Sequence, residues 1–360
     1  MTTQVFYRKW RPQSLAELVG QEAVTRTLAN ALATGRVAHA YLFCGPRGTG
    51  KTSTGRILAK AVNCLTTGGK GEPCNQCGMC QAITEGRALD LVEIDAASNR
   101  GIDEIRSLRE KVRFAPADAR HKVYIIDEVH MLTEPAFNAL LKTLEEPPPQ
   151  IIFVLATTDP HKVPPTVISR CQRFDFRRLS PQAIVTRLQQ VCAAEGIQAA
   201  PELLRAIARH AAGSLRDAEN LLEQLAVAYG PELTLDQVRE LFGLSADQRV
   251  RELARHVLGK DVTAGLAALS KATLEGLDLR QVHRSLVEWL RAALLVKAGA
   301  IEAVDLDADA LADLKALAAV APLEELARAV KLFSQADVRS DVQSPLPLEL
   351  ALVEFSQALS

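Results

Sequence analysis

The sequence predicts an α/β domain built on a parallel sheet, followed by two helical domains. Two observations lead to this prediction. In the first half, short apolar runs alternate with helix-periodic segments, as expected where helices connect parallel strands. After Leu179 no convincing strand follows, and helical periodicity continues to the end of the chain. We therefore expect domains at 1–179, 180–243 and 244–360.

Five apolar runs are the strand candidates: His39–Cys44, Leu89–Asp95, Lys122–Asp127, Ile151–Ala156 and Arg173–Phe176. Among them, helical spacing predicts a helix through Val24 and Leu32 that stops at Gly35, and another around Leu140 that ends before Pro147. Later helices are expected at Pro181–Ala194, Pro201–Ala212, Ser214–Ala228 and Leu235–Phe242. The last third is rich in Ala and Leu, with helix breaks expected near Gly259, Gly276, Gly299 and Pro322.

A glycine-rich loop follows the first strand candidate and fits the pattern G-x-x-x-x-G-K-[ST]. It consists of Gly45, Pro46, Arg47, Gly48, Thr49, Gly50, Lys51 and Thr52. Loops of this kind close backbone N–H groups around phosphate oxygens at a helix N-terminus, where Lys51 can reach the β- and γ-phosphates and Thr52 can bind Mg²⁺. The alternative is a chance match, which the strand before the loop and the helix after it oppose. The loop predicts binding of a nucleoside triphosphate.

Gly55 stands inside the helix that follows this loop. A glycine there costs about 1 kcal/mol relative to alanine, and nothing else in the sequence explains it.

Two carboxylates end the strand candidate Lys122–Asp127. Asp127 at the carboxyl end of a buried strand can organise Mg²⁺, and Glu128 can act as general base toward an attacking water. The alternative is an ordinary acidic strand end that caps the next helix. With the loop upstream, the pair favours hydrolysis over binding alone.

Thr157 and Thr158 follow the strand candidate Ile151–Ala156, so a hydroxyl could bond water or the γ-phosphate; the alternative is a simple turn. From the residues alone, Arg170 and Arg216 are no more than candidate phosphate-binding arginines, because a lone arginine is usually a solvated surface residue.

The motifs together resemble the AAA+ clamp-loader ATPases, and among them the gamma/tau motor subunits of bacterial DNA polymerase III. The resemblance covers nearly the whole chain through Tyr7–Pro12, Val19–Gln21, the loop 45–52, Asp127–His130, Ser169–Cys171 and Gly213–Arg216. It implies a five-stranded AAA+ core, a three-helix lid and a helical collar that holds a pentamer together. A competent phosphate loop distinguishes this chain from delta-prime relatives, which typically lack one, so the resemblance implies a subunit that hydrolyses ATP.

The same resemblance implies roles for particular residues. Arg170 would act in trans on the ATP of a neighbouring subunit, Arg216 would be the sensor of the lid, and Thr158 (or Thr157) would sense the γ-phosphate. The base and ribose would contact Tyr7, Arg8, Pro12 and Val19, and Ser53 would join the phosphate loop in holding the nucleotide. Expected partners are delta and delta-prime subunits, further copies of this chain, a sliding clamp and primed DNA.

Four cysteines, Cys64, Cys74, Cys77 and Cys80, give the spacing C-x9-C-x2-C-x2-C. This set can bind structural zinc through four thiolates, and the polar, glycine-rich segment within it needs such a crosslink to become ordered. An iron–sulfur cluster or a redox pair is the alternative. Zinc is favoured because the bacterial family carries zinc at this place. Cys44, Cys171 and Cys192 are expected to be buried apolar thiols.

Composition restricts the partners. The formal net charge is −1 and aromatic residues make up 4%, which excludes a generally polycationic surface and argues against a stacking platform for single strands. A helix start after Ser98 can bind a DNA backbone phosphate through Asn99 and Arg100, although a plain N-cap turn is equally compatible with the residues. No apolar run approaches the ~18–20 residues of a membrane span, and no signal peptide is recognisable, so we expect a cytoplasmic protein without membrane contact.

Three rival interpretations remain open at this stage. Another AAA+ motor, such as a branch-migration helicase, usually carries a winged-helix domain, which the helical last third opposes. A non-enzymatic scaffold would not need Asp127, Glu128 and Arg170. A eukaryotic-type clamp-loader subunit is disfavoured by the cysteine cluster. Family members often continue into domains that tether polymerase and helicase; since the sequence stops at Ser360, we expect these functions to be absent from it.

Overall fold

The computed structural model describes residues 5–241, 245–275, 277–304, 308–338 and 344–357. Its contacts divide the chain into two compact units, Met1–Leu235 and Asp236–Ser360. The expected boundary near 179 lies inside the first unit, and the one near 244 lies outside the described residues. Both boundaries therefore stay predictions.

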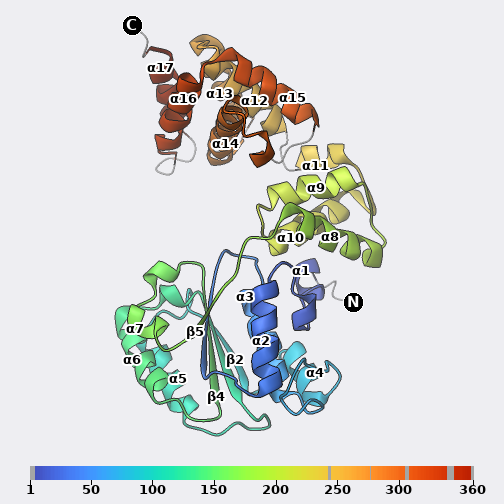
Figure 1. Cartoon of the computed structure of the whole chain (residues 1–360), viewed down its shortest axis with the longest axis vertical. Coiled ribbons are helices and arrows are strands. Elements are labelled where there is room, and N and C mark those ends of the chain that lie inside the picture. The colour runs from blue at the N-terminus through green and yellow to red at the C-terminus, as the bar shows by residue number, and fades with distance from the viewer. Residues whose placement is uncertain (1–4, 242–244, 276, 305–307, 339–343, 358–360) are drawn as a thin grey trace. The chain divides into compact units, whose positions relative to one another are not determined.

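A five-stranded parallel sheet forms the centre of the first unit (Figure 1). Its strands are β1 (Ala40–Cys44), β2 (Leu91–Asp95), β3 (Lys122–Asp127), β4 (Ile151–Thr157) and β5 (Gln172–Asp175). The spatial order is β2-β3-β4-β1-β5. All five strand predictions are confirmed to within two residues. Because every strand runs the same way, the segments that follow β1, β3 and β4 meet at one edge.

Helices cover both faces of the sheet (Figure 1). One face packs against α2 (Glu22–Thr34) and α3 (Lys51–Asn63), the other against α5 (Ile102–Val112), α6 (Glu134–Glu145) and α7 (Pro165–Ile168). Alternate residues of one strand supply the two cores, with Tyr41 in the first and Leu42 in the second. The predicted stop of α2 is confirmed, since Gly35 caps it in the left-handed region at φ 68°.

Gly55 lies where α3 crosses the sheet. A Cβ atom added there would stand 3.1 Å from the side chains of both Ile125 on β3 and Val154 on β4. The glycine that the sequence left unexplained therefore lets α3 approach the sheet closely, and α3 is the helix that follows the phosphate loop.

Shorter elements complete the core. They are α1 (Phe6–Lys9), α4 (Gly78–Thr84) and the 3-10 turns Leu15–Glu17, Val129–Met131 and Pro160–Lys162.

A lid follows, built from α8 (Pro181–Glu195), α9 (Pro201–His210) and α10 (Leu215–Tyr229). The predicted helices are confirmed, but the expectation of a purely helical lid is incomplete. Two strands of two residues each, β6 (Gln198–Ala199) and β7 (Glu232–Leu233), pair in parallel. Strands this short carry no detectable apolar alternation, which is why the sequence did not reveal them.

The second unit is helical where it is described. Its helices are α11 (Leu235–Leu241, starting at the last residue of the first unit), α12 (Ser245–Leu258), α13 (Val262–Leu274), α14 (Leu279–Lys297), α15 (Ala308–Val320), α16 (Leu323–Gln335) and α17 (Leu346–Gln357), with a 3-10 turn at Ile301–Ala303. The breaks expected near Gly259, Gly299 and Pro322 are confirmed, while Gly276 and Phe242 lie outside the described residues.

One core fills this unit. Leu286 and Leu290 of α14 are completely buried in it, together with Phe333 and Phe355, so these apolar residues pack within the chain. None of the described helices combines the length and apolar character that crossing a membrane requires.

Candidate functional site

The phosphate loop joins β1 to α3 at the carboxyl edge of the sheet. The amide of Gly45 donates to the carbonyl of Thr157 at 3.1 Å, which ties the loop to the end of β4. Gly50 caps α3 with φ 101°, a conformation that favours glycine, and Lys51 is the first residue of the helix. The N-terminus of a 13-residue helix therefore lies directly after the loop, at this edge of the sheet.

Lys51 and Thr52 already occupy defined positions. The Nζ atom of Lys51 donates to the carbonyl oxygens of Gly45 and Pro46 at 2.8 and 2.9 Å, and burial lowers the pKa of this lysine while Glu128 and Asp127 oppose the shift. The hydroxyl of Thr52 donates to Oδ2 of Asp127 at 2.8 Å. One hydroxyl and one carboxylate thus share a point beside the loop, a combination suited to a hydrated Mg²⁺.

Glu128 has an unusual backbone conformation for a glutamate. Its φ of 48° lies in the left-handed region, which costs energy in a residue with a side chain and tends to occur at functional positions. The amide and the hydroxyl of Thr158 both donate to its Oε2 atom, at 3.2 and 2.8 Å. His130 Nδ1 lies 3.4 Å from the same oxygen and 3.0 Å from the Thr157 hydroxyl. Two hydrogen bonds therefore join Thr158 to Glu128.

A cavity of about 480 Å³ opens beside these residues. The predicted site residues that line it are Tyr7, Pro12, Val19, Arg47, Gly48, Thr49, Gly50, Lys51, Thr52, Ser53, Asp127, Glu128 and Arg216. Predicted residues outside the lining are Arg8, Gly45, Pro46, Thr158 and Arg170. Of these, all but Arg170 hydrogen-bond to a lining residue.

The lid closes one side of the cavity. The amide of Leu215 donates to the carbonyl of Gly48 at 3.1 Å, and a Cβ atom on Gly48 would collide with the Ser214 hydroxyl. Arg216 lies over the ring of Tyr7, with its guanidinium carbon 4.4 Å from the ring centre. Arg8 donates to the Tyr7 hydroxyl at 3.1 Å and lowers the pKa of that phenol. Arg8 therefore acts on the cavity through Tyr7.

Sequence reasoning missed several lining residues, among them Arg11, Glu17, Asp95, Arg187 and Glu219. Asp95 ends β2, next to Asp127 in the sheet, so the signal that found Asp127 could have found it. Arg187 and Glu219 come from the faces of α8 and α10, and no local pattern separates them from surface charges.

Arg170 is located apart from the cavity of its own chain. It follows α7 and donates to Glu145 Oε1 and to the Thr166 carbonyl, both at 2.7 Å. This arginine is partly exposed, so it is available to another molecule.

The segment of Asn99 and Arg100 forms a turn held together by Asp95. Asn99 donates through both its amides to the Asp95 carbonyl, and Arg100 Nε donates to the Ala97 carbonyl at 2.8 Å. The following first turn of α5 carries Asp103 and Glu104, which oppose an anion at the helix start.

The four predicted ligand cysteines lie together, with all Sγ atoms within 4.8 Å of one another. Backbone amides of Cys74 and Cys77 donate to sulfur atoms of the cluster, at 3.4 and 3.3 Å. Hydrogen bonds from Thr66, Gln76 and Cys77 lower the pKa of Cys74 to about 5, whereas burial raises that of Cys80 to about 12. Of the three other cysteines, Cys44 and Cys192 are buried as predicted, whereas Cys171 is only partly buried. Burial raises the pKa of Cys44, of Cys171 to about 12 and of Cys192 to about 11.

The cysteine segment also holds the chain that leads into the cavity. The buried Lys60 donates to Oε1 of Gln13 at 2.6 Å and to Oδ1 of Asn75 at 2.7 Å. Thr84 donates to the same Gln13 oxygen, and Glu72 accepts from the Leu15 amide at 2.9 Å. Residues 13–15 are thus fastened to the cysteine segment just before Glu17 and Val19 reach the cavity.

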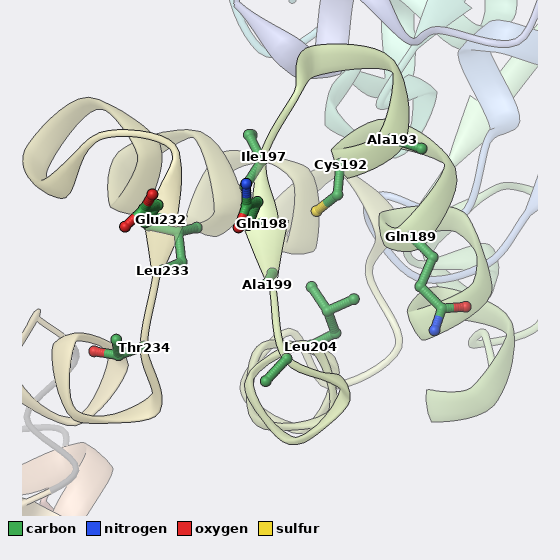
Figure 2. Close-up of a pocket in the computed structure, with 11 residues that line it drawn as sticks. Gln189, Cys192, Ala193, Ile197, Gln198, Ala199, Leu204, Glu232, Leu233 and Thr234 are labelled. Carbon is green, nitrogen blue, oxygen red and sulfur yellow. The ribbon is translucent and has the colours of Figure 1, made fainter.

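A second hollow, of about 660 Å³, lies on the lid (Figure 2). Figure 2 shows Cys192 and Gln189 of α8 and the strand residues Gln198 and Glu232 around it. It brings together no set of groups suited to catalysis, and the pKa of Cys192 is raised. The cavity between loop and lid is the better candidate site.

Three sequence profiles match consecutive parts of the chain. The profile described as DNA polymerase III, delta subunit, matches residues 20–180; the DNA polymerase III clamp loader subunit ATPase lid domain matches 183–232; and DNA polymerase III subunits gamma and tau domain III matches 233–359.

Curated relatives agree with these matches. DNA polymerase III subunit gamma of Buchnera aphidicola subsp. Acyrthosiphon pisum is 40% identical over 291 residues, covering 81% of this chain and 80% of that protein. Subunit tau of Bacillus subtilis is 48% identical over 312 residues, covering 85% and 55%. Subunit tau of Escherichia coli is 45% identical over 278 residues, covering 77% and 43%. The chain thus spans about half the length of these tau relatives. The RuvB Holliday junction branch migration motor of Thermotoga maritima shares only a TM-score of 0.48 at 18% identity, over 75% of this chain and 86% of that chain.

Proposed function

The chain belongs to the gamma/tau family of DNA polymerase III subunits, and we propose that it hydrolyses ATP as a motor of the assembly that loads a sliding clamp onto primed DNA. The observation that supports this most directly is the bond from Thr52 to Asp127 at 2.8 Å, beside a complete phosphate loop. A hydroxyl and a carboxylate at that spacing suit the magnesium that accompanies ATP.

Nucleotide binding follows from the loop. The triphosphate lies along the N-terminus of α3, where backbone amides and the helix dipole favour negative charge. Lys51 exchanges its bonds to the loop carbonyls for β- and γ-phosphate oxygens, and the buried position of its charge strengthens that contact. Thr52 and Asp127 would hold Mg²⁺, which supplies charge neutralisation at the phosphates.

Hydrolysis requires a base and stabilisation of the transferred phosphoryl group. Glu128 is the general base toward water. Thr158, whose hydroxyl donates to Glu128 at 2.8 Å, senses the γ-phosphate by exchanging that hydrogen bond for one to a phosphate oxygen. Arg216, at the start of lid helix α10, adds positive charge and couples the lid to the nucleotide. Phosphoryl transfer commonly also uses an arginine supplied by a neighbouring subunit, and Arg170 is not among the residues that line the cavity of its own chain.

Arg170 completes the site of a neighbouring subunit. Its place outside its own cavity and its partial exposure support a role in trans. The neighbours would be further copies of this chain and the delta and delta-prime subunits, in the cytoplasm. In this proposal the assembly opens the clamp when ATP binds and releases it when ATP is hydrolysed.

DNA contact is proposed through Asn99 and Arg100. A single arginine beside the acidic first turn of α5 gives weak binding, without sequence preference. Several subunits around one duplex would have to combine such contacts.

Structural zinc is proposed for Cys64, Cys74, Cys77 and Cys80. A tetrahedral zinc with bonds of about 2.3 Å places its sulfurs roughly 3.8 Å apart, which the observed cluster allows. Four thiolates leave no position for water, so the metal would crosslink the segment and take no part in hydrolysis. Metal analysis and the absorption spectrum of the purified chain separate zinc from an iron–sulfur cluster.

ATP turnover of the reconstituted assembly tests the function. We expect strong stimulation that needs both the sliding clamp and a primed junction, and loss of turnover with Lys51→Ala. Turnover that is indifferent to the clamp but coupled to movement along strands would contradict clamp loading and favour the helicase alternative.

A further inference from the structure

The cavity has two ends, which α10 connects. At the start of this helix Leu215 bonds to the phosphate loop and Arg216 faces Tyr7. Glu219, one turn further, also lines the cavity, and Glu223, another turn on, accepts from the amide of Phe6 in α1 at 3.0 Å. At about 1.5 Å per residue, Glu219 lies roughly 6 Å along the helix from Leu215. It therefore belongs to the end of the cavity away from the phosphates, where a nucleotide places its base.

Glu219 is buried without a hydrogen-bond partner for one carboxyl oxygen. The residue is 4% exposed, and among the described residues nothing bonds to its Oε1 atom. Arg187 Nε, from α8, is 4.0 Å away, beyond hydrogen-bond distance. The guanidinium of Arg187 instead donates to the Trp10 carbonyl at 2.8 Å and lies over the Trp10 ring. Leaving a buried carboxyl oxygen unbonded costs free energy that a suitable ligand would recover.

The chemistry of the carboxyl matches one class of base. Burial raises the pKa of Glu219 to about 8, although Arg187 opposes the shift. Near neutral pH the group is then largely protonated, with an O–H to donate and an oxygen to accept. Adenine presents the complementary pair, an acceptor at N1 and an amino donor at position 6, whereas guanine presents a carbonyl at that position.

We propose that Glu219 is a specificity-determining residue, which accepts a hydrogen bond from the 6-amino group of the adenine base of the bound nucleotide. The inference rests on the proposed ATP site and adds to it the group that selects the base. Arg187 is a positioning residue in this proposal, since its contacts with Trp10 keep it close to Glu219 without a hydrogen bond to Oε1.

Binding of ATP and of purine riboside triphosphate, which lacks the 6-amino group, tests the proposal on the intact chain with Mg²⁺. We expect the wild type to bind ATP about ten- to a hundred-fold more tightly, as for a bond to a buried polar group. Glu219→Gln keeps an accepting oxygen and should keep most of that preference. Glu219→Leu should bring the two affinities to near equality.

Two controls make the outcomes distinct. Glu223→Leu removes a carboxyl one turn away that does not line the cavity, and should weaken both nucleotides alike. Equal affinities in the wild type, with both lost in Lys51→Ala, would overturn the base-reading role while leaving the ATP site intact. A Glu219→Leu variant that weakens both nucleotides equally would show a purely structural role. Failure of the wild type to bind ATP in a Lys51-dependent way would instead contradict the proposed function.

Discussion

The phosphate end and the base end of the cavity are built differently. At the phosphate end, consecutive residues supply most of the groups, and the polar atoms already have partners, as Lys51, Thr52 and Glu128 show. At the base end, Tyr7, Arg187 and Glu219 come from segments far apart in the sequence, and no residue that the structure describes bonds to Oε1 of Glu219. A preformed phosphate end suits chemistry, and an unsatisfied base end suits recognition. We therefore expect changes at the first to alter rate and changes at the second to alter affinity or stability.

The largest effect is expected from Arg170→Ala, because Arg170 lies outside the cavity of its own chain and is proposed to act on the nucleotide of a neighbour. Turnover of the assembly should fall by ~10³–10⁵ while ATP affinity stays unchanged. Arg173→Ala is the matched control, since Arg173 pairs with Asp175 and should be dispensable. Mixing Arg170→Ala chains with Lys51→Ala chains should restore turnover, because each supplies what the other lacks. No recovery in mixed assemblies would contradict action in trans.

Glu128→Gln should lower turnover by ~10²–10⁴, as expected when a general base is removed. ATP affinity should stay within a few-fold, because Thr158 can still bond to the amide oxygen that replaces its carboxylate partner. Single-turnover hydrolysis and equilibrium binding, measured on the same preparation, separate the two. A parallel loss of affinity would break the division between the two ends. Glu134→Gln, in the first turn of α6, serves as control.

The free energy of unfolding of the first unit should depend on pH through Glu219. The folded carboxyl keeps its proton up to about pH 8, whereas an ordinary glutamate releases it near 4.5. The folded state therefore binds more protons between these values, and stability is full below pH 4.5 and declines as pH rises toward 8. The loss is on the order of a few kcal/mol. Urea unfolding of wild type and Glu219→Gln across this range should show a flatter profile in the variant; identical profiles would mean that Glu219 does not titrate in this way.

The smallest effect is expected from Lys60→Met. It removes two hydrogen bonds that join residues 13 and 75, each worth about 0.5–1.5 kcal/mol. Loosening of the segment before Val19 should weaken ATP binding by less than about ten-fold and leave the rate at saturating ATP unchanged. Lys70→Met, at an exposed position of the cysteine segment, should change neither. Removing zinc by chelation should also weaken ATP binding. Unaltered ATP affinity of the metal-free chain would mean that the cysteine segment does not influence the cavity.

The same contrast explains what the sequence could predict. The five strands, the loop and the position of Asp127 could be predicted because apolar runs and a contiguous motif encode them. The cysteine cluster could be predicted because its four members are close together in the sequence. Arg187 and Glu219 could not, since their meaning arises only when α8 and α10 fold against the N-terminal segment. Gly55 looked like a defect of helix α3 until its two sheet neighbours, Ile125 and Val154, were known.

The contacts of the N-terminal segment also set an order of events during synthesis. The Phe6 amide of α1 donates to Glu223, and Trp10, just after α1, donates to Glu195 at 2.8 Å, so residues of the lid hold this segment. On the ribosome the sheet and its phosphate loop can form first, while the first residues to emerge wait for α10. The oldest part of the nascent chain is thus among the last to settle, and a ribosome stalled before residue 223 would carry a core able to contact phosphate but not to enclose a nucleotide.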